Sequence, residues 1–331
     1  DLNQDGKIWG PKESGKLYEN LSANPPAVGR DGFQQAPPVV QGRFEAVESF
    51  RQAEVRTAAA TQRGDAFARE GKLAGGVAQG EPMDTANARP VVRLDEAAKV
   101  SACKRAGVDP ATIEFAFANL SHGGAFHTAL VPKGAVSNAY LLLETFPAPV
   151  PAAHAMLRFE LKGDKPAILV PQNQDPHPKT LALPDLVFSS EALGQPGWKY
   201  SLPGGQGGNF GMVDRMESLE DRFRHVESYT PAHPVTQYRL PLTDEQKTNM
   251  LRTALHQSEE RGLHETYNTL FQSCAIEAFD VMDKGIGNDV SPLVHLGRIF
   301  SDERIPTMGP KALQMRGLLA PGEQPTLLKD E

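Results

Sequence analysis

Two strongly apolar runs separated by a proline-rich link constrain the fold of this chain more than any other feature. Residues 139–146 and 153–161 have the composition of buried β-strands, and the link 147–151 has the sequence PAPVP. In the second run, alternation puts Ala155, Leu157, Phe159 and Leu161 on one face. It puts His154 on the other face, at the start of the strand. The sequence therefore predicts a β-sheet here, with a third strand at 167–170 after a tight turn.

One of the two cysteines, Cys274, stands at the start of a predicted helix. Ile276, Phe279 and Met282 recur at three-residue steps, and Ser273 before them can serve as the N-cap. A thiol in the first turn faces unpaired N–H groups and the positive end of the helix dipole, which stabilise a thiolate. The alternative is a structural thiol, since free Cys is among the most buried residue types.

Capping signals predict two helices in the segment 91–135. Residues 94–107 end at a glycine, and Asp109 before Pro110 opens a second helix. The apolar face of that second helix consists of Ile113, Phe117 and Leu120. The other cysteine, Cys103, lies on the first helix amid Ala, Lys and Arg, which is typical of a packing or disulfide cysteine.

The stretch between the strands and the Cys274 helix is less regular. Residues 191–211 contain the glycine-rich run GGQGG, but they lack the GxxxxGK[ST] pattern, so we reject nucleotide binding. The alternatives are a mobile loop over a cleft and a plain surface loop. Residues 212–226 are dense in charge and predict a solvated helix. Thr243 and Gln246 form a capping box for a helix that runs to about Arg261.

The first residues of the chain resemble the start of an EF-hand calcium loop. The candidate ligands are Asp1, Asn3, Asp5, the Lys7 carbonyl and Glu13. The twelfth position of the loop, where a bidentate Glu belongs, is Lys12, and the acidic residue comes one position late. The alternatives are a Ca²⁺ site and an Asx-rich surface turn.

The spacing of Pro and Gly divides the chain into three parts. Residues 1–90 form an extension that contains the EF-hand-like loop, a predicted long amphipathic helix over 42–72 and a loose segment over 73–89. Residues 91–135 form the helical segment. Residues 136–331 form the predicted main domain with a C-terminal tail.

Composition excludes two classes of function. The net charge is −7 and no basic tract is present, so we expect no nucleic-acid partner. No apolar run approaches the about 20 residues that a membrane helix needs, so we expect no membrane span. No signal peptide is visible, but the chain begins without Met, so this absence says little about the compartment. In a secreted protein, Cys103 and Cys274 could form a disulfide.

The run AYLLLETFPAPVPAAHAMLRFEL, followed by YRLPLTDEQ and YNTLFQSCAIEAFDVMD, resembles the DUF4105 family, also called the Lnb N-terminal periplasmic domain. The resemblance covers residues 138–284. It implies an α+β, circularly permuted papain-like fold of the NlpC/P60 and lecithin:retinol acyltransferase kind, and a periplasmic or secreted location. It also implies that Cys274 is the nucleophile and His154 the base. Ser273 and Ala153 depart from the pattern, which has Asn and Gly there.

Two hypotheses of function follow. The first is a thiol-dependent hydrolase or acyltransferase that needs no cofactor and acts on an amide or ester in a peptide, lipid or cell-envelope substrate. Gln172, in the loop after the third strand, is the candidate to orient His154. The second is a non-catalytic secreted or envelope binding protein with a degenerate papain-like fold and a calcium-stabilised N-terminus. It predicts a Cys103–Cys274 disulfide or an inert buried thiol.

Overall fold

The structure is a computed structural model that describes residues 67–68, 70–146, 153–173, 175, 177–198, 200–229, 231–269, 273–287, 309–319 and 325–328. The candidate calcium ligands Asp1, Asn3, Asp5, Lys7 and Glu13 lie outside the described residues, as does most of the helix predicted over 42–72.

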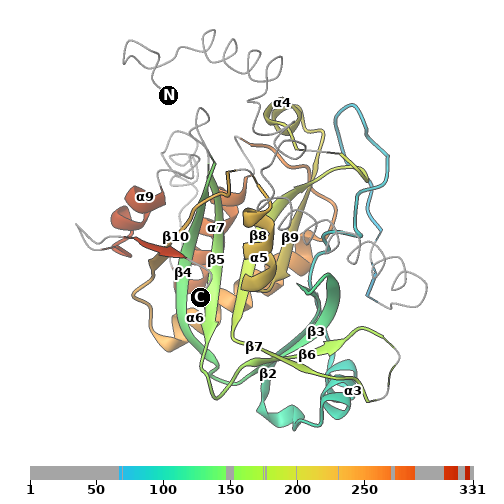
Figure 1. The fold of residues 1–331 in the computed structure, drawn as a ribbon, viewed down its shortest axis with the longest axis vertical. Coiled ribbons are helices and arrows are strands. Elements are labelled where there is room, and N and C mark those ends of the chain that lie inside the picture. Colours follow the sequence, from blue (N-terminus) through green and yellow to red (C-terminus); the bar gives the residue numbers. More distant parts are fainter. Residues whose placement is uncertain are drawn as a thin grey trace.

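The described strands form a single, mainly antiparallel sheet (Figure 1). They are β1 Val92–Arg93, β2 Ile113–His122, β3 Ala125–Pro132, β4 Val136–Thr145, β5 Ala153–Leu161, β6 Ala167–Pro171, β7 Leu181–Leu183, β8 Asp185–Leu193, β9 Gly211–Glu217, β10 Val235–Arg239 and β11 Thr326–Leu328. Their order is β11-β10-β4-β5-β8-β9-β2-β3-β6-β7, with β1 paired to β2. Only the β2–β9 pair is parallel among the pairs of described strands. The predicted α+β class is therefore correct.

The described helices are α3 Glu96–Ala106, α4 Leu202–Gln206, α5 Leu219–Glu227, α6 Asp244–Arg261, α7 Cys274–Ile286 and α9 Gly309–Met315. Helix α5 covers one face of the central strands, and α6 and α7 cover the other. The largest core cluster joins β4, β5 and β8 to α6 and α7, whereas a smaller cluster joins the opposite face of these strands to α5. Figure 1 shows α5 in front of the sheet and α6 and α7 behind it.

The strand β5 has the predicted bounds and the predicted alternation. The side chains of Leu157 and Phe159 pack in the core with α7. His154 points to the opposite face, as expected, but that face is covered too, because Met156 on it packs against α5 residue Val226. His154 is consequently buried rather than facing solvent.

The two helices behind the sheet also follow the sequence signals. Thr243 and Gln246 make both hydrogen bonds of the predicted capping box, and α6 ends at Gly262. Helices α6 and α7 cross at Gly285, where an added Cβ would lie 2.5 Å from the Cα of Met250. Only a residue without a side chain allows this approach.

The prediction of a second helix after Asp109 is wrong. Asp109 does cap a turn, but that turn is a short 3-10 helix, Pro110–Thr112, and β2 follows at once. The helix-like spacing of Ile113, Phe117 and Leu120 arises because β2 is buried on both faces, so apolar side chains occupy most positions. Residues 91–135 are thus not a helical segment, and the boundary at 136 would cut through the sheet.

Two other segments also differ from the expectation. Residues 212–226 form β9 and α5 instead of one charged helix, because the charged side chains of β9 pair inside the protein. The segment 73–89, expected to be loose, packs Leu73 and Met83 into a small core. Within it, buried Arg89 lies 4.2 Å from the ring centre of Phe126.

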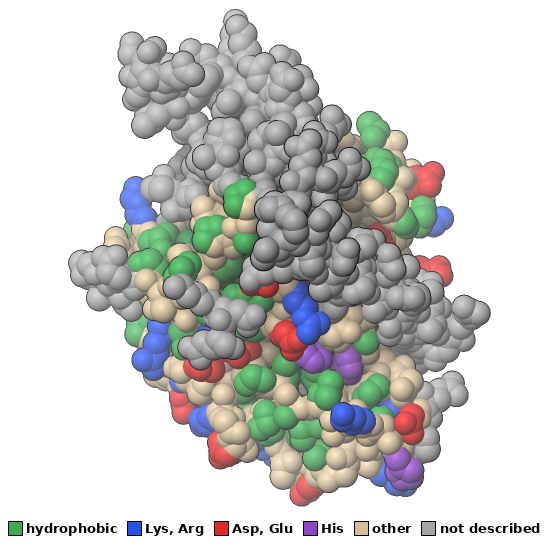
Figure 2. All heavy atoms as spheres, viewed as in Figure 1, with side chains coloured by type: hydrophobic (Ala, Val, Ile, Leu, Met, Phe, Trp, Pro, Cys, Tyr) green, Lys and Arg blue, Asp and Glu red, His purple; other side chains and the backbone are tan. Residues whose placement is uncertain are grey.

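One further expectation concerns the membrane. Within the described ranges, no helix is both long and apolar enough to cross a membrane. Figure 2 shows the face that carries α5, where positive and negative side chains are interspersed over the described residues.

Candidate active site

The thiol of Cys274 meets the imidazole of His154 where the start of α7 meets the start of β5. The sulfur is hydrogen bonded to His154 and to the backbone N–H of Ala155. Both side chains are buried, with Cys274 5% and His154 9% exposed. The structure therefore brings together the two residues that the sequence singled out as nucleophile and base.

The sheet itself provides the place for this contact. The ladder between β5 and β8 ends at the pair Met156 and Ser189, and the next residues on the same face would be His154 and Glu191. The N–H of Ala155, which lies between His154 and Met156, faces the Cys274 sulfur. The thiol thus lies at the end of the ladder.

The carboxylate beside the histidine belongs to Glu191. Its Oε1 lies 3.3 Å from the Nε2 of His154. Because Nε2 faces Glu191, Nδ1 is the nitrogen left for the sulfur. Cys274, His154 and Glu191 thus form a thiol, imidazole and carboxylate series, the arrangement that activates a cysteine nucleophile.

The prediction that Gln172 orients His154 is wrong. Gln172 accepts a hydrogen bond of 2.7 Å from the backbone N–H of Asn119 and donates one of 3.2 Å to the Asn119 side chain. It follows β6, which is separated from β8 in the sheet by three strands. Glu191 is not among the predicted site residues, because the apolar run of β8 was not predicted to be a strand. An acidic residue near the end of that run was the available signal.

Buried Arg222, on α5, holds Glu191 in place. Its Nη2 lies 2.5 Å from Oε1 of Glu191, and its Nε donates a 2.7 Å hydrogen bond to Glu217. Its Nη1 lies 3.6 Å from Glu144. Ser189 donates a further hydrogen bond of 2.7 Å to Oε1 of Glu191. One arginine thus neutralises carboxylates from three strands, which stabilises their charged forms in a buried position.

The electrostatics favour a thiolate and an imidazolium. Burial by itself raises the pKa of the Cys274 thiol, but the charge and hydrogen bond of His154 outweigh it and lower the pKa from 9.0. Burial by itself lowers the pKa of His154, but the charges of Glu191 and Cys274 outweigh it and hold that pKa well above 6.5. The two shifts have opposite directions, as a buried ion pair requires.

A second carboxylate, Glu144, lies on the same face of the sheet. It is the cross-strand neighbour of His154 on β4 and lies 2.7 Å from Nδ1 of His233. Burial by itself raises the pKa of Glu144, but the hydrogen bond from His233 and the charge of Arg222 outweigh it and lower the pKa. Acidic groups therefore flank His154 on both sides along the sheet.

The start of α7 differs in one detail from the expectation. Ser273 has the extended backbone of an N-cap residue, but its side chain makes no capping hydrogen bond, and its buried Oγ has no hydrogen-bond partner among the residues that the structure describes. Tyr267 lies beside this turn, with its phenol near the backbone N–H of Cys274. Burial, together with the negative charge of Cys274, raises the pKa of Tyr267.

The other cysteine, Cys103, does not join the site. Cys103 packs on α3 in a separate small cluster with Ile113 and Leu130, and neither cysteine forms a disulfide. Burial raises the pKa of the Cys103 thiol, which makes it a poor nucleophile. Over the part of the chain that the structure describes, no group of three or more His, Cys, Asp or Glu side chains could hold a metal ion.

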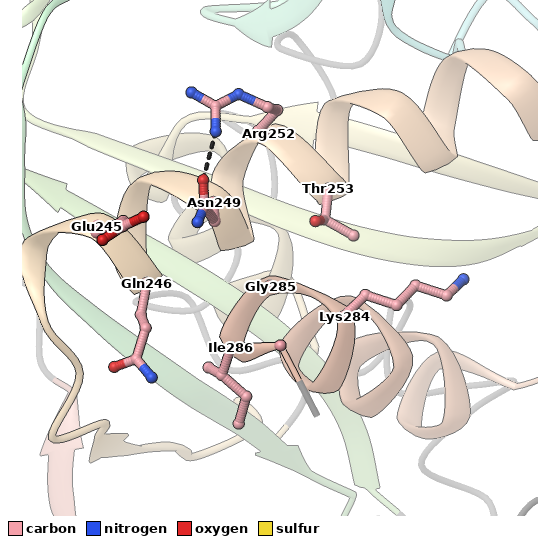
Figure 3. Close-up of a pocket in the computed structure, with 9 residues that line it drawn as sticks. Glu245, Gln246, Asn249, Arg252, Thr253, Lys284, Gly285 and Ile286 are labelled. Atoms are coloured by element: carbon pink, nitrogen blue, oxygen red, sulfur yellow. Dashed lines mark hydrogen bonds between the residues drawn. The ribbon is translucent and has the colours of Figure 1, made fainter. Parts of the chain in front are cut away.

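A hollow of about 420 Å³ lies at the other end of α7 (Figure 3). It is lined by Glu245, Gln246, Asn249, Arg252, Thr253, Lys284, Gly285, Ile286 and Gly287. Asn249 and Arg252 are hydrogen bonded to each other there. Because Cys274 is the first residue of α7 and Gly287 follows the last, this hollow is not part of the thiol site.

In comparisons with family models, with curated proteins and with solved structures, no match to the chain was found.

Proposed function

We propose that this protein is a thiol-dependent hydrolase or acyltransferase that acts on an amide or ester. The observation that carries the proposal is the contact of the Cys274 sulfur with His154, whose Nε2 lies 3.3 Å from Glu191. In the proposal, Cys274 is the nucleophile, His154 transfers protons and Glu191 orients His154. The opposite pKa shifts of the thiol and the imidazole support these roles, because a preformed thiolate is the reactive species.

The first half of the reaction acylates the enzyme. The Cys274 thiolate forms an S–C bond to the substrate carbonyl carbon, and the electrons of the C=O bond move to oxygen. When they return, the C–N or C–O bond breaks, and the leaving amine or alcohol takes the proton of the His154 imidazolium. Glu191 keeps the imidazole oriented through both steps.

The second half releases the acyl group. Water, or an amine or alcohol acceptor, attacks the thioester carbon while neutral His154 takes its proton. The S–C bond then breaks and the thiolate and imidazolium form again. The positive end of α7, at which Cys274 stands, favours the negative charge of the thiolate and of the tetrahedral intermediate.

We also propose a specific fold family for the chain. A strand histidine that precedes a helix cysteine in the chain supports a circularly permuted papain-like core and membership of the DUF4105 family. The resemblance also motivates an envelope location, periplasmic or secreted, and a peptide, lipid or cell-envelope substrate. The EF-hand-like loop motivates Ca²⁺ as a stabilising ion of the N-terminal extension, with no part in the reaction.

One observation favours the non-catalytic alternative, in which Cys274 is an inert structural thiol. The side chain is only 5% exposed, and burial is typical of structural cysteines. In that alternative, His154 and Glu191 would form an ion pair of the core. The two proposals differ in the reactivity of the thiol.

The test is the rate of alkylation by iodoacetamide as a function of pH, with the modified residue identified by mass spectrometry. The expected result is that Cys274 reacts with an apparent pKa well below about 8.5, the value of an ordinary thiol. Cys103 serves as the internal reference for an ordinary thiol. In Cys274→Ala, the alkylation that occurs at low pH should be lost. The proposal would be contradicted if Cys274 reacted only with the pKa of an ordinary thiol, or did not react at all.

A further inference from the structure

We propose that the rings of Tyr200 and Trp198 form a binding subsite for an aromatic side group of the substrate, next to the scissile carbonyl of a peptide-like amide. This inference rests on the proposed function of the Cys274 site. It assigns the segment between β8 and β9, which the Cys274, His154 and Glu191 series does not use.

A continuous series of aromatic rings links the thiol to the surface. Tyr267, beside the backbone N–H of Cys274, meets Tyr200 in a T-shaped contact with ring centres 5.9 Å apart. Tyr200 lies 5.4 Å from Phe210, and Phe210 lies 6.2 Å from Trp198. A group attached close to a carbonyl at Cys274 would therefore lie beside Tyr200.

The series is buried at the end near the thiol and open at the other end. Tyr267 and Phe210 are 6% and 3% exposed, whereas Tyr200 and Trp198 are 44% and 41% exposed. Single exposed apolar residues are ordinary, but these two large rings both contact Phe210, and Tyr200 also contacts Tyr267 beside the thiol, so together they form the kind of patch that binds a ligand. The buried pair supports the exposed pair from beneath.

Glycines bring the backbone close to these rings. An added Cβ at Gly194 would lie 2.9 Å from the Cβ of Trp198, and one at Gly204 would lie 2.8 Å from the ring of Phe210. At Gly205 it would lie 2.9 Å from the hydroxyl of Tyr200. The glycine-rich run that lacks the phosphate-binding pattern thus has a physical role, because it lets α4 and the preceding turn pack against the aromatic series.

The geometry favours an aromatic occupant. Two ring pairs of the series cross at 76° and 85°, in the edge-to-face arrangement that aromatic rings prefer, and the third pair crosses at 44°. A substrate ring against Tyr200 and Trp198 would extend the same pattern. The Tyr200 hydroxyl is already paired with the Thr269 hydroxyl at 2.9 Å, so the subsite offers ring surface rather than charge.

The test compares three alkylating probes that differ only in their side group: iodoacetamide, N-benzyl-iodoacetamide and N-hexyl-iodoacetamide. Second-order rate constants at Cys274 of the full chain are divided by those of free cysteine, which removes the intrinsic reactivity of each probe. The corrected benzyl rate is expected to exceed the corrected iodoacetamide rate by about three- to tenfold, the range for one aromatic contact. The hexyl probe should gain less.

Two variants test the rings themselves. Trp198→Ala and Tyr200→Ala should each lower the ratio of benzyl to iodoacetamide rates toward one. The matched control is Leu327→Ala, since Leu327 on β11 is 47% exposed and should leave the ratio unchanged.

The possible failures are distinguishable. A reactive Cys274 with no benzyl preference, or with a preference that survives both ring variants, overturns the subsite and leaves the proposed function standing. A hexyl gain equal to or above the benzyl gain overturns the aromatic assignment in favour of a hydrocarbon chain. A Cys274 with ordinary thiol reactivity toward iodoacetamide overturns the proposed function and the subsite with it.

Discussion

His154 and Glu191 occupy positions that would face each other in the β5–β8 ladder if the pairing continued by one more step on the same face. Their side chains meet instead at 3.3 Å, at the point where the Cys274 sulfur bonds to the adjacent backbone N–H. The end of one strand pair thus orders three functional groups. This relationship makes the role of each group testable.

Glu191→Gln should weaken the nucleophile. Loss of the carboxylate charge lowers the pKa of His154, and a less charged His154 raises the pKa of Cys274. The charge of Glu191 itself also raises the pKa of Cys274, but the effect of His154 on the thiol is larger, so the thiolate is less populated at neutral pH in the variant. We expect kcat/KM on an activated ester to fall by about 10²-fold or more, and the alkylation profile to shift to higher pH. The matched control is Glu220→Gln, because Glu220 pairs with Arg224 on the exposed side of α5. An unchanged pH profile in Glu191→Gln would contradict the assignment.

Arg222→Met should destabilise the fold. It leaves the buried carboxylates Glu191, Glu217 and Glu144 without their shared cation, and breaking such a buried network costs about 3–5 kcal/mol. Urea unfolding measures the loss. Arg224→Met removes an exposed ion pair on the same helix and should cost about 0.5 kcal/mol or less. Equal effects of the two substitutions would show that the buried network is not stabilising.

Acid should unfold the protein through Glu144 and Glu191. The pKa of each carboxyl is lowered from 4.5 in the folded chain, so each contributes stability that is present above pH 4.5 and is lost as the pH falls through its folded pKa. The urea concentration at the unfolding midpoint, measured from pH 7 downward, should therefore decrease once the pH is below 4.5. In Glu144→Gln, stability at pH 7 should be lower but its decline in acid less steep, whereas Glu220→Gln should retain the full slope. A wild-type midpoint that stays constant below pH 4.5 would contradict the linkage.

Gly285→Ala should force α6 and α7 apart. The new Cβ would lie 2.5 Å from the Cα of Met250, which is backbone and has no rotamer by which to move away. Overpacking of this kind costs about 1–3 kcal/mol, measurable as a lower urea midpoint. Gly163→Ala is the matched control, since none of the described atoms lies within 4 Å of its added Cβ. Helices that tolerate Gly285→Ala as well as the control would show that their packing adjusts.

The features predicted correctly from sequence depend on local chemistry. Period-two alternation identifies β5 and the face of His154, since successive side chains of a strand point to opposite sides. The capping box of Thr243 and Gln246 identifies the start of α6 for a similar reason, because all its hydrogen bonds join residues within one turn.

The errors arise where a local signal competes with tertiary burial. The start of β2 carries a real capping signal at Asp109 and apolar residues at helical spacing, yet the segment is a strand. Pairing with β3 on one side and β9 on the other decides its conformation, and those partners are distant in the chain. Propensity is a weak prior against burial of this extent.

The sequence by itself determined the strand that carries His154, the helix that begins at Cys274 and the α+β class. Only the tertiary structure decided that Glu191, and not Gln172, lies beside His154. The neighbour of a side chain across a sheet depends on strand order and register, which are set by the burial of the whole sheet and not by any local pattern. The same long-range packing brings Arg222 to three carboxylates and makes a buried charge network at this position stable.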